Sequence, residues 1–150
     1  MGKLILVISM LINNNLKNCR EELEITQEEL GKVLGVSRKT VTGWENNYDT
    51  MPLRKMVQFS NLYKYSLDYI TGLSSKNEYV KIDKLDKKKI GNNLKELRVN
   101  LKMTQKQIAD ECMISQTTYS NYETGQYLIT TLTLYTICYN HKLSIYNIIR

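Results

Sequence analysis

The groups most suited to binding chemistry lie between positions 37 and 46, in a stretch that predicts a helix. Helical spacing places four residues on one side of this helix, namely Arg38, Lys39, Thr42 and Gly43. Val41 and Trp44 fall on the opposite side, which is therefore apolar. One side suits burial, and the other offers guanidinium, ammonium and hydroxyl donors to an anionic partner.

Two helices joined by a tight turn are predicted to position this side. Thr26 and Glu29 form a capping box, so a helix begins directly after Thr26. Gly35 supplies the left-handed conformation that ends a helix, and Ser37 caps the helix that follows. Gly31 lies inside the first helix, where glycine costs about 1 kcal/mol relative to alanine. Its presence predicts a close approach to the second helix.

The whole pattern occurs twice, at an offset of 78 residues and without a gap. The repeated positions pair Arg20 with Arg98, Gln27 with Gln105, Ser37 with Ser115, and Glu45 with Glu123. Chance matches do not keep one spacing over about 60 residues. The outer side of the second copy consists of Gln116, Thr117, Ser120 and Asn121. The repeat predicts an all-α chain of two tandem domains with five helices each.

Domain boundaries follow from the repeat and from the polar composition between its copies. We expect domain 1 at residues 13–73, a linker at 74–86 and a more divergent domain 2 at 87–150. Three lysines, at positions 87 to 89, begin the first helix of domain 2, where the helix dipole disfavours cations. A nearby phosphate backbone is one reason for lysines there, and plain solvation is the other.

Two apolar segments lie outside the repeats. Residues 4–12 form a run about half as long as a membrane-spanning helix requires, so we expect neither a membrane segment nor a membrane partner. Their β-branched side chains suit a short strand, as do residues 79–82 in the linker, and we hypothesise that the two segments pair, within one chain or between two chains. The alternative is that translation starts at Met10 and that the preceding residues are incidental.

Composition limits the partners and the chemistry. The 150 residues carry a formal charge of +6 and a pI near 9.1, which favours a polyanionic partner, although charge alone does not distinguish nucleic acid from an anionic membrane. Three cysteines without a close pair indicate reduced thiols in a cytoplasmic protein. His141 is the single histidine, and the sequence has no glycine-rich phosphate loop. We therefore expect no enzyme, no metal and no cofactor.

These residues resemble the phage repressor and Cro-like helix-turn-helix family, also called the xenobiotic-response-element type. The resemblance rests on TQEELGKVLGVSRKTVTGWEN at residues 26–46 and on TQKQIADECMISQTTYSNYET at residues 104–124. With the flanking helices, it covers nearly all of residues 13–150. It implies five-helix domains that place the second helix of the motif in the major groove of double-stranded DNA.

The resemblance also implies roles for individual residues. Those implied to face base edges are Arg38, Lys39, Thr42 and Gly43. Those implied to contact the DNA backbone are Gln27, Ser37 and Asn46. The DNA-binding residues implied in domain 2 are Gln105, Ser115, Gln116, Thr117, Ser120 and Asn121. The implied structural ion pairs are Arg20 with Glu45 and Arg98 with Glu123.

Three departures from the family pattern affect these roles. Gly43 stands where relatives often carry a base-reading amide, so domain 1 is expected to read fewer bases. Met113 replaces the turn glycine in domain 2, which predicts a strained or reshaped turn unless that residue leaves the left-handed region. The outer side of the second copy is uncharged, although Gln116 or Asn121 can still read adenine.

Two functions follow. The first is a sequence-specific, repressor-like transcriptional regulator, bacterial or from a mobile element, in which domain 2 takes a second half-site or mediates dimerisation. The alternative is a protein-interaction module, such as an antitoxin or an anti-repressor, in which the tyrosine-rich domain 2 contacts a protein.

Overall fold

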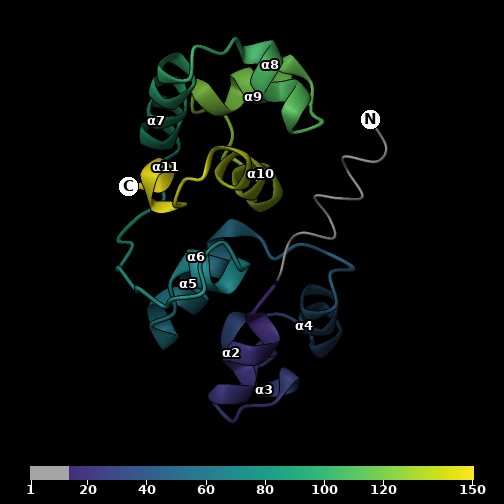
Figure 1. Ribbon diagram of the computed structural model, residues 1–150. Helices are drawn as coiled ribbons and strands as arrows, with labels where there is room; N and C mark the ends of the chain where they lie inside the picture. The colour runs from purple at the N-terminus through teal and green to yellow at the C-terminus, as the bar shows by residue number, and fades with distance from the viewer. Residues whose placement is uncertain (1–13) are drawn as a thin grey trace. The chain divides into compact units, whose positions relative to one another are not determined.

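The computed structural model describes residues 14–150, and all secondary structure in that range is helical (Figure 1). The chain divides into two compact units, one ending at Lys81 and one beginning at Ile82, and the division falls inside the expected linker. The predicted all-α class is confirmed. None of the helices in residues 14–150 combines the length and the apolar character that crossing a bilayer requires.

Five helices form the described part of the first unit. They are α2 (Leu16–Glu22), α3 (Gln27–Leu34), α4 (Arg38–Glu45), α5 (Leu53–Tyr63) and α6 (Leu67–Thr71). The predicted capping box is present: Thr26 Oγ1 accepts from Glu29 N at 3.1 Å, and Glu29 Oε2 accepts from Thr26 N at 2.7 Å. Gly35 ends α3 with a φ of 72°, in the left-handed region, as predicted.

Five helices also form the second unit. They are α7 (Lys87–Asn100), α8 (Gln105–Glu111), α9 (Gln116–Glu123), α10 (Thr131–His141) and α11 (Tyr146–Ile149). Thr104 and Gln107 form the second capping box. Met113 has a φ of 58°, so it adopts the conformation that Gly35 has in the first unit. The turn between α8 and α9 is therefore kept, at a cost of about 1–2 kcal/mol in backbone strain.

The close approach predicted at Gly31 is confirmed. The core residues that α3 and α4 contribute, each at most 2% exposed, are Leu30, Leu34, Val41 and Trp44. A Cβ on Gly31 would lie 2.7 Å from the Val36 carbonyl oxygen and 3.3 Å from the Ser37 carbonyl carbon. The near atoms thus belong to the turn and to the cap of α4, and a larger residue would push α4 away from α3.

The candidate strand in the linker does not form within the described residues. Residues 79–82 form no strand with any part of residues 14–150. Tyr79 instead reaches back to α5, where its hydroxyl donates to Asn61 Oδ1 at 3.0 Å and Lys64 Nζ lies 5.1 Å from the centre of its ring. Side-chain contacts with α5 therefore hold this segment. A β-branched composition alone does not make a strand, because a strand also needs a neighbouring strand to pair with. The other candidate strand, residues 4–12, lies outside the described residues.

Candidate nucleic-acid interface

The polar side chains singled out in the first copy of the motif lie on α4. Ser37 caps this helix, and its hydroxyl oxygen accepts a hydrogen bond from the backbone of the first turn at 3.1 Å. Arg38 and Lys39 are exposed in that turn, whereas Thr42 and Gly43 are half-buried one turn later. The positive charge of α4 therefore gathers at its N-terminal end.

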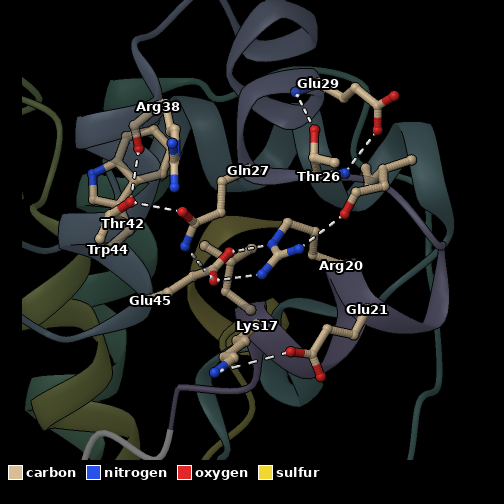
Figure 2. A network of polar contacts seen from close by, with 12 residues as sticks. Lys17, Arg20, Glu21, Thr26, Gln27, Glu29, Arg38, Thr42, Trp44 and Glu45 are labelled. Carbon is tan, nitrogen blue, oxygen red and sulfur yellow. Dashed lines mark hydrogen bonds and ion pairs between the residues drawn. The ribbon is translucent and has the colours of Figure 1, made fainter.

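A buried ion pair fixes the last turn of α4 to α2 (Figure 2). Arg20 Nε donates to Glu45 Oε2 at 2.7 Å, and Arg20 Nη2 donates to Glu45 Oε1 at 3.0 Å. The Glu45 side chain is only 1% exposed. The hydrogen bond to Glu45 raises the pKa of Arg20 above its usual value, against the opposing effect of burial. Breaking such a pair is strongly destabilising, because one charge is left buried without its partner.

Gln27 connects the ion pair to the outer side of α4 (Figure 2). Its Nε2 donates to Glu45 Oε1 at 3.1 Å, and its Oε1 accepts from Thr42 Oγ1 at 2.9 Å. The Thr42 hydroxyl also lies 3.0 Å from the Arg38 carbonyl oxygen, and its single proton serves one acceptor at a time. The Oε1 atom and one Nε2 hydrogen of Gln27 are thus engaged within the domain, and the amide carries a second Nε2 hydrogen.

An open hollow of about 400 Å³ lies beside this network. The residues that line it are Arg20, Thr26, Gln27, Glu28 and Arg38. The hollow is therefore placed at the start of α3 and next to the first residue of α4. The Arg38 guanidinium and the positive end of the α3 dipole attract an anion there, whereas the Glu28 carboxylate repels one.

The ion pair and its contact with a glutamine recur in the second unit. Arg98 Nε donates to Glu123 Oε1 at 2.6 Å, and Gln105 Nε2 donates to Glu123 Oε2 at 2.8 Å. Burial disfavours the charge of Glu123, but hydrogen bonds from Arg98, Gln105 and Tyr119 prevail and lower the pKa of its carboxyl below the usual value. The scaffold behind α9 matches the scaffold behind α4, so the two helices differ mainly in their outer side chains.

The outer side of α9 is uncharged. Ser115 caps the helix, and its hydroxyl oxygen accepts from the backbone of the first turn at 3.0 Å. The exposed residues on this side are Gln116 and Thr117, and the half-buried ones are Ser120 and Asn121. Amide and hydroxyl groups therefore occupy the positions that carry arginine and lysine in α4.

The loops after α4 and α9 each present an exposed tyrosine, and the sequence pattern did not single out the first of them. Tyr48 is 85% exposed after α4, and Tyr127 is 57% exposed after α9. Tyr48 N donates to the Gly43 carbonyl oxygen at 2.9 Å, so this loop folds back on the end of α4. Asn46, the expected backbone contact, is the exposed C-cap of α4. An aromatic residue in an otherwise polar loop was the only signal for Tyr48.

Known sequence families match both units. Residues 16–70 match the family described as Helix-turn-helix, and residues 91–150 match the family described as Helix-turn-helix domain. One match falls in each compact unit. Each half of the chain is therefore a helix-turn-helix domain of the phage repressor and Cro-like type, and the units are called domain 1 and domain 2 below.

Curated relatives of the chain come from Bacillus subtilis (strain 168). The uncharacterized HTH-type transcriptional regulator YqaE is 31% identical over 60 residues, which cover 40% of this chain and 52% of YqaE. The HTH-type transcriptional regulator ImmR is 31% identical over 72 residues, which cover 46% of this chain and 57% of ImmR. The chain thus spans about half the length of these relatives. No solved structure matches the chain.

Proposed function

We propose that the chain is a sequence-specific, DNA-binding transcriptional regulator that acts in the cytoplasm and has no catalytic role. In this proposal, α4 enters the major groove of double-stranded DNA. The observation that carries it is the pair of exposed cations, Arg38 and Lys39, on a helix that the buried Arg20 and Glu45 pair holds in place. The names of the relatives, which are transcriptional regulators, support the same function.

In domain 1, the cations of α4 read bases and the groups around them set the register on the duplex. Arg38 and Lys39 donate to guanine O6 and N7, and the methyl group of Thr42 meets a thymine methyl. Gly43 adds no side chain to the groove. The residues we assign to backbone phosphates are Gln27, Ser37 and Asn46, which lie at or near the ends of α3 and α4.

Domain 2 takes a second, unlike half-site. Because the scaffold behind α9 matches that behind α4, the outer residues of α9 are presented in the same way. Gln116 and Asn121 carry the amide groups that pair with adenine N6 and N7. The remaining contacts on this half-site are assigned to Gln105, Ser115, Thr117 and Ser120. The operator is then not a palindrome, with guanine contacted by domain 1 and adenine contacted by domain 2.

The uncharged side of α9 also favours a second candidate for domain 2, a contact with a protein or with a second copy of the chain. Under the strongest form of this alternative, the chain is an antitoxin or an anti-repressor. It then binds DNA weakly and without base preference, and its stable complex is with a protein.

Selection of duplex oligonucleotides by the full chain, followed by a salt titration on the recovered site, separates these functions. The regulator should recover a consensus with two unlike half-sites, and its affinity should fall steeply as salt rises. A consensus with one half-site would assign domain 2 to a protein contact. Flat, weak binding without a consensus would refute the regulator and support the interaction module.

A further inference from the structure

Three consecutive lysines at the start of α7 have no role in the proposed function so far. Lys87, Lys88 and Lys89, called the lysine cluster here, occupy the first turn of α7, and all three are exposed. None of them forms an ion pair with a carboxylate in residues 14–150. Cations are unfavourable at this end of a helix dipole, so the stability of α7 does not explain the cluster.

The adjacent acid is already engaged with the backbone. Asp86 Oδ1 accepts from Lys88 N at 3.0 Å and from Lys89 N at 3.2 Å, so it serves as the N-cap of α7. The carboxylate thus anchors the start of the helix, while the three ammonium groups remain directed to solvent or to a partner outside the described chain.

Two glycines hold α7 against the C-terminal end of α9. A Cβ on Gly91 would lie 2.6 Å from the Tyr122 carbonyl oxygen. Gly125 follows α9 with a φ of +76°, and a Cβ on it would lie 2.8 Å from Lys88 Cα and 2.9 Å from Lys88 Cγ. Because Gly91 meets the backbone at the end of α9, and Gly125 meets the backbone and the side-chain stem of Lys88, the lysine cluster has a defined position at the end of α9.

The charge distribution in domain 2 suggests a role for the lysine cluster at the end of α9. Lysine and arginine that neutralise phosphates supply the part of DNA affinity that is independent of sequence. In domain 1 two exposed cations, Arg38 and Lys39, lie on α4 itself. The outer side of α9 has none, and the lysine cluster brings three to the end of that helix.

We propose that the lysine cluster contacts the phosphate backbone of duplex DNA beside the groove that α9 faces, and supplies the electrostatic contacts that α9 lacks. This inference rests on the proposed function. The competing explanation is structural, because cations near the C-terminal end of α9 also favour its dipole.

A salt titration of DNA binding by the full chain tests the proposal with three variants. The neutral variant is Lys87→Gln/Lys88→Gln/Lys89→Gln. The charge-matched control replaces exposed lysines elsewhere that form no ion pair in residues 14–150, as Lys32→Gln/Lys76→Gln/Lys142→Gln. The third variant keeps the charge, as Lys87→Arg/Lys88→Arg/Lys89→Arg. Each is measured on the selected duplex and on random duplex, together with its thermal unfolding midpoint.

In the neutral variant, the negative slope of log affinity against log salt should become less steep by about 2 to 3, since each phosphate contact contributes about −0.9. Affinity at low salt should fall on the order of tenfold or more on both duplexes, whereas the arginine variant should keep the wild-type slope. If the neutral variant does not fold, Lys87→Gln and Lys89→Gln singly should each make the slope less steep by about 1.

Two results would overturn the lysine cluster as a DNA contact. One is a control that loses as much affinity and slope as the neutral variant. The other is a neutral variant that keeps the wild-type slope and loses only thermal stability, which is the outcome of the structural explanation. Failure of the wild-type chain to select any consensus counts against the proposed function instead. An unchanged slope with an intact consensus counts against the cluster alone.

Discussion

Arg20 and Glu45, which are 25 residues apart in the chain, form a two-point ion pair that joins α2 to the last turn of α4. Arg98 and Glu123 repeat this relationship between α7 and α9. In domain 1 the pair is buried, whereas Arg38 and Lys39 are exposed. Stability of the domain and contact with DNA therefore depend on different residues, and mutations can separate them.

Glu45→Ala should lower the free energy of unfolding of domain 1 by about 3–5 kcal/mol, because Arg20 is left buried without its partner. Trp44 is the only tryptophan of the chain and is 2% exposed, so its fluorescence during denaturant unfolding reports on domain 1. Lys17→Ala is the control, since it removes an exposed pair with Glu21 that is worth less than about 1 kcal/mol. A loss no larger than that of the control would contradict the role of the pair.

Gly31→Ala should destabilise domain 1 by about 1–3 kcal/mol, because the added Cβ would meet the Val36 carbonyl oxygen at 2.7 Å. Gly43→Ala is the matched change in α4. The nearest atom to a Cβ there is Asp49 Cβ at 3.9 Å, so alanine should add up to about 1 kcal/mol through helix propensity. Tryptophan fluorescence measures both variants, and equal effects of the two alanines would be inconsistent with a close approach at Gly31.

Domain 2 should lose stability in acid through Glu123. The pKa of this carboxyl is lower in the folded domain than in the unfolded chain, so the ionised form stabilises the fold. The contribution is fully present above the unfolded-state pKa, about 4.3, and is lost as the pH falls through the lower folded-state pKa. Thermal unfolding followed by circular dichroism should show that Glu123→Gln is less stable than the wild type at neutral pH. The stability of the variant should also fall less than that of the wild type as the pH is lowered. A pH profile identical to that of the wild type would exclude this role.

Gln27→Ala should weaken binding to all duplexes alike, on the order of tenfold, because Gln27 is assigned to a phosphate and not to a base, and Thr42 keeps its contact with the Arg38 carbonyl oxygen. Competition between selected and random duplex measures the effect, and base preference should be retained. A change of preference at one position, with random binding intact, would reassign Gln27 to base reading.

Local chemistry made much of the scaffold predictable from sequence. Thr26, Gly35 and Ser37 act on backbone groups within one helical turn, so their effects depend little on the rest of the fold. The close approach at Gly31 was predictable for a similar reason. Glycine destabilises a helix interior, so it is expected there where a larger side chain would clash with a neighbouring element. The fixed offset of 78 then extended the same scaffold to the second copy.

Contacts between residues distant in the chain could not be predicted in the same way. The direction of the Gln27 amide depends on Glu45, 18 residues away. Residues 79–82 have strand-like composition, but Tyr79 packs on α5 and pairs with no strand in the described chain. At Met113, the sequence allowed either a reshaped turn or a methionine in the left-handed region. The structure has the second, a strained residue in an unchanged turn.

The base preference of Arg38→Ala is the most direct test of α4 as the helix that reads DNA. Arg54→Ala, at an exposed position of α5, is the charge-matched control. Duplex selection with Arg38→Ala should lose the preference for guanine at one position of the domain 1 half-site, a loss of about 1–3 kcal/mol on the wild-type site, and keep the rest of the consensus. An unchanged consensus, or equal losses on selected and random duplex, would contradict base reading by α4.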